Sequence, residues 1–581
     1  MPADALHYKF IAQELSDALT NGRIDKITSA DIGAVRLSVY ANGKTRHLFI
    51  SISPARARCL LTEQPTQSLL TPTPFAAHLK KHLLGGRITQ IAAEPNERVV
   101  KIFIAAKDEL GYDAAFTLYA EIMGKHSNLI LVNGSGKITD SIKRVPFDMS
   151  SKRQVLPGLP YTPAPVQNKA NPLDENSLHA VLDAYSGGDL RSYLLQSLSG
   201  LSPASIFESV FNAFDMKNKN LTSDVLKVTG AKLTELALKR LAKEIKRLFD
   251  PAEFAPCVQV VDGQTVDFYL KPYHSCDAVG YEKAATLNEA AERYYREAEI
   301  TDTMNKKQHK LTAVVKADLA RAEKKLAALL EHKFSAEDFE HDRIKGEILT
   351  ANLYRIKHGD KVLTAENYYV VPPIPIRIPL DDALSPAKLA GRFYKQYQKK
   401  KKTLEVTTPQ IEAAKTDIEY LDSILTSLAA YESLSDLDEI AEELTIKGLL
   451  KEKKTEKRKV KTDTALSGVK KTEFDGYLIL TGKNNLQNDA LVKSCAPNDL
   501  WLHTKNIHGA HTVIVNPKKT LPPEGVIRHA AQITALYSKA SDSEGVPVDY
   551  TFAKFVSKQK SAAPGKVIYK NQKTVYVTPK K

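Results

Sequence analysis

The stretch VVKADLARAEKKLAALL, residues 314–330, repeats apolar residues at alternating separations of four and three. A second stretch, IEAAKTDIEYLDSILTSL at residues 411–428, has the same spacing. The apolar positions are Val315, Leu319, Ala322, Leu326 and Leu329 in the first stretch and Ile411, Ala414, Ile418, Leu421, Leu425 and Leu428 in the second. Charged residues lie between them, a pattern that predicts coiled-coil helices. Because short isolated helices are marginally stable in water, we expect the two to pair as an antiparallel hairpin.

The segment between the two helices, GEILTANLYRIKHGDKVLTAENYYVVPPIPIRIPL at residues 346–380, is rich in β-forming residues. We expect it to form a small β-rich middle domain at the hairpin tip, spanning residues 340–385. Arm and middle domain together are assigned to residues 266–450. Two interpretations of the helices stay open: the core of a helical bundle, or an arm that reaches a distant surface.

The N-terminal part of the chain mixes helical and strand-like patterns. Residues 6–24 have helical apolar spacing, and Asn42-Gly43 lies between two β-rich runs, which is the strongest short signal for a β-hairpin. A second hairpin is expected at Asn133-Gly134. The adjoining residues Gly134–Lys137 superficially resemble a phosphate loop, but the G-x-x-x-x-G-K-[ST] spacing is missing. We expect a mixed α/β domain over residues 1–170.

Residues 171–265 are expected to form a mainly helical domain, after a Pro-rich linker at residues 156–172. Its residues Gly200–Pro203 separate two short amphipathic runs. A Gly-centred turn before a helix can present backbone N–H groups to a phosphate. An ordinary packing corner between two helices is the alternative, and the residues alone favour it slightly.

The C-terminal part of the chain, residues 451–581, is expected to form a compact α/β domain. It begins with the basic run KEKKTEKRKVK, residues 451–461, which is typical of a solvated linker or a polyanion contact. Beyond it, short β-type runs surround one helix at residues 525–540.

The chain has 581 residues, of which 43% are hydrophobic and 26% are charged. This length and composition indicate a globular protein of about three to five domains. The N-terminal segment, residues 1–15, lacks the pattern of a signal peptide, and no apolar run approaches the roughly 20 residues of a spanning helix. The cysteines Cys59, Cys257, Cys276 and Cys495 form no C-x-x-C pair, which argues against structural zinc. We therefore expect a cytoplasmic protein with no membrane partner.

The formal charge of +14, with a pI near 9.2, attracts polyanions. Nucleic acid is the favoured partner, because neutralising phosphates releases condensed counterions. A membrane surface or plain solubility is the alternative explanation.

The segment DLWLHTKNIHGAHTVIV, residues 499–515, contains three histidines and the only tryptophan of the chain. His503, His508 and His511 beside Asp499 suggest a metal or general-base site. A zinc site needs three or four converging ligands, usually supported by Cys or a carboxylate. On a strand, the side chain of His503 points to the face opposite those of Leu502 and Thr504. His508 is expected at a turn, where nothing directs it toward the other two histidines. We therefore expect no metal and no other cofactor.

Four stretches resemble the NFACT family, whose bacterial members are called RqcH. They are EIMGKHSNLILV at 121–132, VLPGLPYTPAP at 155–165, GEILTANLY at 346–354 and NDALVKSCAPNDLWLHTKNIHGAH at 488–511. The resemblance covers essentially the whole chain. It implies an α+β multidomain fold: a formamidopyrimidine-glycosylase-like NFACT-N domain at 1–170, a helix-hairpin-helix domain at 171–265, the antiparallel coiled-coil arm with its middle domain at 266–450, and a compact α/β NFACT-R domain at 451–581.

Glycosylase activity is not expected despite that domain resemblance. The glycosylases use an N-terminal Pro followed by Glu, and usually a Cys-based zinc finger. Here Pro2 is followed by Ala3, and the cysteines are scattered.

The resemblance implies a factor of ribosome-associated quality control. RqcH-like proteins bind a large (50S) ribosomal subunit, with its rRNA, that is obstructed by peptidyl-tRNA. They recruit alanyl-tRNA and promote untemplated C-terminal alanine tailing, which marks the stalled chain for degradation. The ribosome forms the peptide bonds, so no catalytic residues are expected, and a Hsp15-like accessory factor (RqcP) is a further implied partner.

The resemblance also implies the tRNA-binding residues Glu97, Arg98, Glu121, Ile122 and Met123. Lys125 and His126, which follow in the sequence, are expected to add phosphate contacts to the tRNA. Glu97 stands where the family usually has Asp. The negative charge is kept, but the extra methylene moves the carboxylate further from the backbone. This departure bears more on which tRNA is selected than on tRNA binding itself. Arg98 can fork onto phosphate or a base edge while Glu97 accepts from a base amino group; a surface ion pair is the alternative. The implied NFACT-R signature, or ribosome-facing residues, are Asp499, Trp501, His503, Lys505, Gly509 and His511.

Two other functions stay open. An older family name, fibronectin-binding protein A, suggests a surface adhesin that binds fibronectin, although no signal peptide or wall anchor is evident. The other is a generic RNA-binding module without tailing activity.

Overall fold

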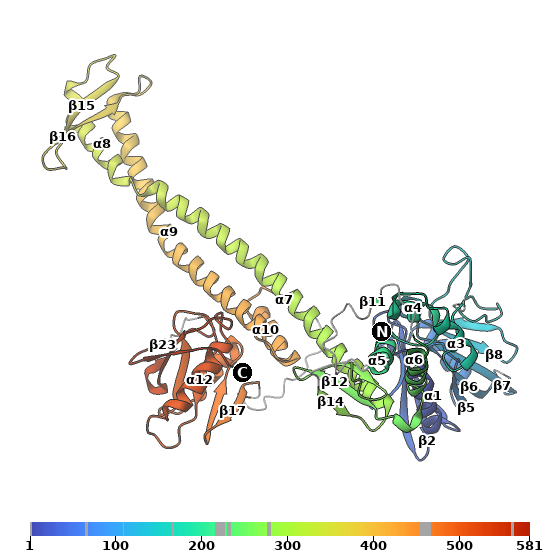
Figure 1. Ribbon diagram of the computed structural model, residues 1–581. Coiled ribbons are helices and arrows are strands. Elements are labelled where there is room, and N and C mark those ends of the chain that lie inside the picture. The colour runs from blue at the N-terminus through green and yellow to red at the C-terminus, as the bar shows by residue number, and fades with distance from the viewer. Residues whose placement is uncertain are drawn as a thin grey trace. The chain divides into compact units, whose positions relative to one another are not determined.

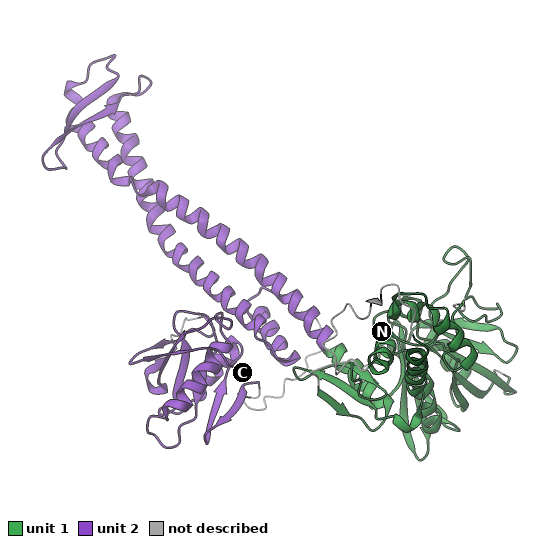
Figure 2. Cartoon of the chain, viewed as in Figure 1, with its two compact units in different colours: residues 1–300 green, residues 301–581 purple. Residues whose placement is uncertain are grey.

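The computed structural model describes residues 3–63, 68–108, 110–165, 168–214, 234–275, 280–451, 466, 468–558 and 563–580, and the backbone of 227–228. Pro2, Cys276 and the basic run after Lys451 lie outside the described residues. The chain forms two compact units, Met1–Ile300 and Thr301–Lys581 (Figure 2). It is a mixed α/β multidomain protein, as predicted; the division into four domains stays a prediction.

The first unit is built on a nine-stranded antiparallel sheet with the order β4-β3-β2-β1-β5-β6-β7-β8-β9 (Figure 1). Its strands are β1 (Arg23–Asp31), β2 (Ala34–Ala41), β3 (Lys44–Ser51), β4 (Arg58–Thr62), β5 (Arg87–Ala93), β6 (Val99–Lys107), β7 (Asp113–Glu121), β8 (Asn128–Asn133) and β9 (Ile138–Ser141). The helices α1 (Ala5–Leu19) and α2 (Pro74–Leu83) share its hydrophobic core.

Both predicted hairpins of this sheet are confirmed. Asn42 and Gly43 have φ of 51° and 78° between β2 and β3, as a two-residue type I′ turn requires. Residues Gly134–Lys137 join β8 to β9, and the Asn133 Oδ1 accepts the N–H of Ser135 at 3.2 Å and of Lys137 at 3.0 Å. The positive φ of 77° falls on Gly136, so this loop is longer than a two-residue turn.

The helical part of the first unit contains α3 (Glu175–Asp183), α4 (Leu190–Ser197), α5 (Pro203–Ala213) and α6 (Glu235–Arg247). A short pair, β10 (Gly188–Asp189) and β11 (Lys227–Val228), lies among them. A three-stranded sheet follows, ordered β13-β12-β14, with β12 (Cys257–Val261), β13 (Gln264–Tyr269) and β14 (Gly280–Lys283).

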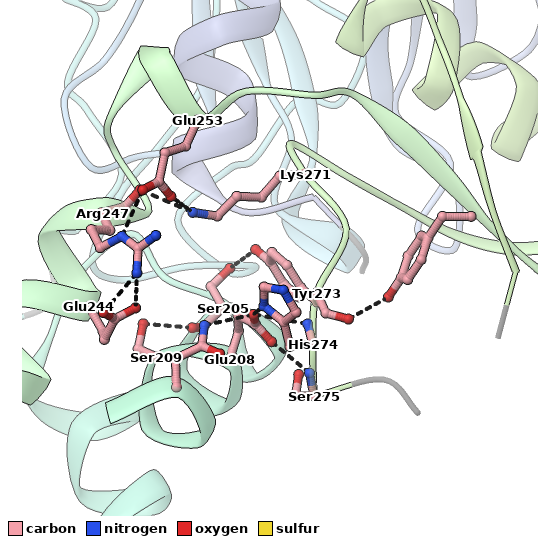
Figure 3. Close-up of polar contacts among 12 residues, drawn as sticks. Ser205, Glu208, Ser209, Glu244, Arg247, Glu253, Lys271, Tyr273, His274 and Ser275 are labelled. Atoms are coloured by element: carbon pink, nitrogen blue, oxygen red, sulfur yellow. Dashed lines mark hydrogen bonds and ion pairs between the residues drawn. The ribbon is translucent and has the colours of Figure 1, made fainter. Parts of the chain in front are cut away.

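Polar side chains attach α5 and α6 to the segment after β13 (Figure 3). The Glu208 carboxylate of α5 accepts the backbone N–H of His274 at 3.0 Å and of Ser275 at 2.8 Å. From the end of α6, Arg247 donates to Glu253 at 2.7 Å, and Lys271 pairs with the same carboxylate. These contacts fix the orientation of α5, whose N-terminus lies near the candidate site described below.

A buried carboxylate, Asp4, joins the chain start to α5. Its Oδ2 accepts the Ser202 N–H at 2.9 Å and the Ser205 hydroxyl at 2.8 Å, and its Oδ1 lies 2.7 Å from the His7 Nδ1. The Ser205 Oγ lies 3.2 Å from the Tyr273 hydroxyl (Figure 3). Burial alone raises the pKa of Asp4, but His7 and the hydrogen bonds from His7 and Ser205 outweigh it and lower the pKa to about 2.

A second buried carboxylate, Glu121, ends β7. Arg153 donates to its two oxygens at 2.9 and 2.6 Å, and the Tyr161 hydroxyl donates at 3.0 Å. The Arg153 and Glu121 side chains are 13% and 2% exposed, respectively. The pair therefore ties the segment of residues 153–161 to the end of β7.

The second unit contains the predicted helical hairpin. The helices are α7 (Leu287–Ala336), which begins in the first unit, α8 (Phe339–Ala351), α9 (Pro386–Ala429) and α10 (Leu434–Ile446). Gln308 contacts the Leu428 carbonyl at one end and Lys400 pairs with Asp338 at the other, so α7 and α9 run antiparallel (Figure 1).

The core of this hairpin includes a third helix. Val315, Leu421 and Leu428 of the predicted seams are buried, while Leu326 and Leu329 are only partly buried. The cluster around them also contains Tyr420, Ile424, Leu437, Ile440 and Leu444. Tyr420 and Ile424 lie outside the heptad positions and pack with the α10 residues, which a two-helix pattern does not reveal.

At the tip, β15 (Val362–Asn367) and β16 (Ile374–Pro379) form an antiparallel pair whose apolar residues cluster with those of α8 and α9. The expected strands at the tip are present, but residues 346–351, which were expected to be β-rich, lie in the helix α8. The β-rich middle domain stays a prediction. Among the described residues, no helix has the long apolar stretch that crossing a membrane requires.

The C-terminal part is a six-stranded antiparallel sheet with the order β17-β18-β20-β19-β21-β24. The elements are β17 (Lys470–Phe474), β18 (Tyr477–Thr481), α11 (Asn485–Ser494), β19 (Leu500–Thr504), β20 (Thr512–Ile514), α12 (Glu524–Leu536), β21 (Val546–Phe552), β22 (Val556–Ser557), β23 (Ile568–Tyr569) and β24 (Lys573–Val577). Leu500 and Leu502 pack on the α12 side, and Trp501 packs in a separate cluster. The predicted strands and the helix α12 are confirmed, but the expectation of a single helix is wrong, because α11 is a second helix of this part.

We expect Arg153→Ala to destabilise the end of β7, because it leaves the Glu121 carboxylate buried without its cation. The loss should be about 3 kcal/mol, measured by hydrogen exchange of β7 and β8 peptides. Arg144→Ala is the matched control, since Arg144 pairs with Asp140 from a side chain that is 60% exposed; it should cost less than about 1 kcal/mol. Equal losses would contradict the buried pairing.

Asp4 should make stability depend on acid. Its folded pKa of about 2 lies below the ordinary 3.8, so its contribution of about 2 kcal/mol is present above pH 4 and is lost as the pH falls toward 2. Wild type should therefore exceed Asp4→Asn in urea resistance at pH 5, with a smaller margin at pH 2.5. The exposed Asp113→Asn serves as control and should change little at either pH. A margin independent of pH would refute this role.

Candidate nucleic-acid interface

The loop of residues 94–98, between β5 and β6, lies beside the end of β7. Val99 pairs with Glu121 across the two strands, and the Ile122 N–H donates to the Arg98 carbonyl at 2.8 Å. The sheet register therefore brings Glu97-Arg98 next to Glu121–Met123, although a whole β-hairpin separates the two segments in the sequence.

These two segments open onto a cavity of about 540 Å³, here called the loop cavity. Glu97, Arg98 and Met123 line it, together with Lys169 and the turn Gly200–Pro203. Gly200 has a φ of 76°, and a Cβ there would lie 3.3 Å from the Asn96 Cα. Glycine thus permits the turn to approach the loop closely.

The turn Gly200–Pro203 does not hold a free phosphate site in this structure. Ser202 caps α5, with its side chain accepting from the Ser205 N–H. The Ser202 N–H itself donates to Asp4. Because an internal carboxylate already lies at this helix N-terminus, the turn is a packing corner that shapes the cavity wall.

Charges of both signs meet in the loop cavity. Burial raises the pKa of Glu97. The positive charges of Arg98 and Lys169 oppose that rise, and the negative charge of Glu94 adds to it. Lys169 donates to the Leu195 carbonyl at 2.8 Å. A guanidinium and a partly buried carboxylate at adjacent positions can engage phosphate and base edges respectively.

The three residues Glu121–Met123 differ in exposure: the first two are buried, and the third faces the cavity. Both Glu121 oxygens are engaged by Arg153, and Ile122 is fully buried. Met123 alone of the three lines the cavity. Direct RNA contact by Glu121 and Ile122 stays a prediction; the geometry gives them a role in holding Met123 and Arg98 in place.

Lys125 and His126 lie in the one-turn helix η1 (Gly124–His126), and both are exposed. The turn is fixed by the Ser127 hydroxyl, which accepts the Met123 N–H at 2.8 Å, and by Asn128, which bonds the backbone of Lys143. Ser127 and Asn128 thus fix this turn, and both basic side chains are accessible to a polyanion.

The C-terminal signature residues are mostly structural. Asp499 accepts the N–H of Ala496 at 2.8 Å and of Asn516 at 2.9 Å. Trp501 is fully buried and stacks on His503, with ring centroids 5.8 Å apart. A Cβ on Gly509 would lie 2.7 Å from the Ser538 Cβ, which explains the glycine. Lys505 is exposed.

One expectation about this segment is wrong: His508 does share a site with the other two histidines. His503, His508 and His511 line one cavity of about 170 Å³, here called the histidine cavity. The loop between β19 and β20 folds back, which strand alternation does not show. Within the residues that the structure describes, no group of His, Cys, Asp or Glu side chains is arranged to hold a metal ion.

Sequence reasoning missed several lining residues. Lys169 and Tyr161 of the loop cavity lie in the segment read as a linker, and Asn485 and Asn488 of the histidine cavity lie on α11. The sequence signal for the last two was the three asparagines in KNNLQND, residues 483–489, and such a cluster indicates a helix start as readily as a site.

Comparisons with known proteins agree along the whole chain. The family model "NFACT N-terminal and middle domains" matches residues 4–463, and "NFACT protein RNA binding domain" matches residues 469–571. The chain is 34% identical over 588 residues to "Rqc2 homolog RqcH" of Bacillus subtilis (strain 168), covering 100% of this chain and 98% of the relative. It is 32% identical over 583 residues to the protein of the same name from Streptococcus suis (strain 05ZYH33), with the same coverage.

Solved structures include the N-terminal part of the fibronectin/fibrinogen-binding protein from Streptococcus suis, at 26% identity and a TM-score of 0.42, covering 50% of this chain and 98% of that one. The family match over residues 4–463 and the near-complete coverage of the two RqcH relatives confirm the resemblance seen in the sequence. The chain belongs to the NFACT family, the family of the RqcH proteins.

Proposed function

We propose that this protein is a ribosome-associated quality control factor. It binds obstructed large (50S) ribosomal subunits that carry peptidyl-tRNA, recruits alanyl-tRNA, and promotes untemplated C-terminal alanine tailing of the stalled chain. The observation that carries the proposal is the full-length similarity to proteins named Rqc2 homolog RqcH. The match of residues 469–571 to an RNA-binding domain and the net charge of +14 support an RNA partner.

In this proposal the loop cavity receives the tRNA. Arg98 forks onto a phosphate or base edge, Glu97 accepts from a base amino group, and Lys125 and His126 add phosphate contacts. Glu121 acts from beneath, by fixing the end of β7. Peptide bonds are formed by the ribosome, so the protein recruits and positions tRNA and is not itself the catalyst.

The finer architecture is part of the same proposal. Residues 171–265 act as a helix-hairpin-helix domain beside a glycosylase-like NFACT-N domain, and the antiparallel helices α7 and α9 act as the arm that reaches the subunit. The protein works in the cytoplasm, and a Hsp15-like accessory factor (RqcP) is a further partner. The alternatives are a fibronectin-binding adhesin and an RNA-binding module without tailing activity.

RNA that copurifies with the tagged full-length protein should contain large-subunit rRNA and should be enriched in alanine tRNA. Sequencing that RNA against an untagged control tests the proposal. Ribosomal RNA without tRNA enrichment would favour the generic RNA-binding module, and the lack of both would reject the quality control function.

Arg98→Ala, alone or with Glu97→Ala, should abolish alanine tailing while large-subunit association stays largely intact, because the loop cavity serves tRNA and not the subunit. Tailing is measured on a stalled reporter chain, and association by sucrose-gradient cosedimentation. Arg87→Ala is the matched control, since Arg87 begins β5 and the loop follows the other end of that strand. If Arg98→Ala also lost subunit binding, this division of roles would be wrong.

A further inference from the structure

The histidine cavity lies within the second unit, where α9, α11 and the β19–β20 loop meet. Its walls include the rings of His503, His508, His511 and Tyr569 and the side-chain amides of Asn485 and Asn488. The tRNA contacts proposed for the loop cavity do not involve this space.

Aromatic rings form one side of the cavity in fixed orientations. His503 and His511 meet edge to face, with centroids 5.2 Å apart and planes at 89°. Trp501 lies behind them, stacked on His503 and tilted against Tyr569 at 4.8 Å. Tyr569 is held by its hydroxyl, which donates to Asp549 at 3.0 Å. Rigid rings of this kind offer faces for stacking a planar ligand.

Side-chain amides on the other side are held in place by hydrogen bonds within the chain. The Asn488 Oδ1 accepts the backbone N–H of His511 at 3.0 Å, and Asn485 donates to the Ser423 hydroxyl at 3.0 Å and to Glu443 at 3.1 Å. The His511 side chain is 1% exposed, and its Nδ1 has no hydrogen-bond partner among the described residues. A buried polar atom that lacks a partner is costly.

The histidines stay neutral at physiological pH. Burial lowers the pKa of His503 to about 4 and lowers the pKa of His511 well below its ordinary value. A neutral imidazole presents one donor and one acceptor. The cation in the wall, Lys566, already pairs with Glu419 at 2.9 Å. These groups therefore match a neutral heterocycle better than a phosphate.

The cavity has the size of one aromatic ring system. Its volume of about 170 Å³ is close to that of a cavity of about 150 Å³ known to accept benzene. We propose that the histidine cavity binds a single unstacked nucleobase of an RNA strand, stacked on its aromatic wall and hydrogen-bonded by its imidazole and amide groups. Sequence-specific RNA recognition commonly uses splayed bases in this way.

The inference rests on the proposed RNA-binding function and adds the chemical group that the C-terminal part recognises. It also explains why three signature residues lie together: His503 and His511 line the cavity, and Trp501 packs behind their rings. Because the proposed ligand is a base, the site must distinguish base-containing RNA from a sugar-phosphate backbone that has no bases. Equal binding of the two would contradict the proposal.

Trp501 provides a reporter, because it is the only tryptophan of the chain and lies against the wall rings. The full-length protein is titrated with five-nucleotide RNAs of each base type and with an abasic ribose-phosphate pentamer, following Trp501 fluorescence. At least one base-containing pentamer should change the emission with saturation and bind about tenfold more tightly than the abasic one.

Thr416→Phe should block the cavity and remove this preference. Thr416 lines the cavity from α9, is exposed, and donates to the Glu412 carbonyl at 2.9 Å. Thr408→Phe is the matched control: Thr408 is exposed on the same helix, donates to the Leu404 carbonyl at 2.8 Å, and is not among the cavity-lining residues. Unchanged Trp501 emission without RNA shows that both variants fold.

Three results would overturn the inference: equal responses to abasic and base-containing pentamers, RNA binding with no change in Trp501 emission, or a Thr416→Phe variant that keeps the preference. The proposed function is judged separately. If wild type fails the base test yet still copurifies with large-subunit rRNA and alanine tRNA, the base site is wrong and the quality control function stands.

Discussion

The hydrogen bond from the Ile122 N–H to the Arg98 carbonyl, at the end of the β6–β7 ladder, is the constraint on which the candidate tRNA site depends. A strand register cannot slip by one residue without turning its side chains to the other face. The buried pair of Glu121 and Arg153 lies one residue from this bond and fixes the same strand end. A costly buried ion pair therefore lies beside the backbone bond that positions Arg98, and if Arg98 binds tRNA as proposed, such a pair can serve specificity more than stability.

Asp4 is a second buried carboxylate that fixes a wall of the loop cavity, the one formed by the start of α5. A helix N-terminus attracts anions, and α5 would be open to phosphate if no carboxylate lay at its start. Asp4 occupies that position from within the chain, so RNA phosphate has no reason to bind there. Lys125 and His126 are exposed in the turn after β7, so in the proposed function RNA phosphate meets these side chains and not the start of α5.

Local signals in the sequence were sufficient for much of the fold and for the family. Asn42-Gly43 specified its hairpin, and the heptads at residues 315–329 and 411–428 specified the antiparallel helices. The failures involve contacts between distant residues. Nothing local shows that Arg153 buries Glu121, that Ser202 bonds Asp4 from a distant part of the chain, or that α10 completes the helical core. His508 was misplaced for the same reason, since strand alternation stops where the loop begins.

The two candidate RNA sites would bind RNA through different interactions. Together they could give the protein both affinity for RNA and selectivity among RNAs. Contacts of Arg98 and Lys125 with phosphate gain free energy from released counterions and weaken as salt rises. A base held between His503, His511 and Tyr569 gains free energy from stacking and from neutral hydrogen bonds, which salt screens little. Charge recruits any RNA, whereas a cavity the size of one ring accepts only a base that can leave its stack. Because the neutral state of the histidines follows from their burial, the fold of the C-terminal sheet itself sets the chemistry that this cavity can read.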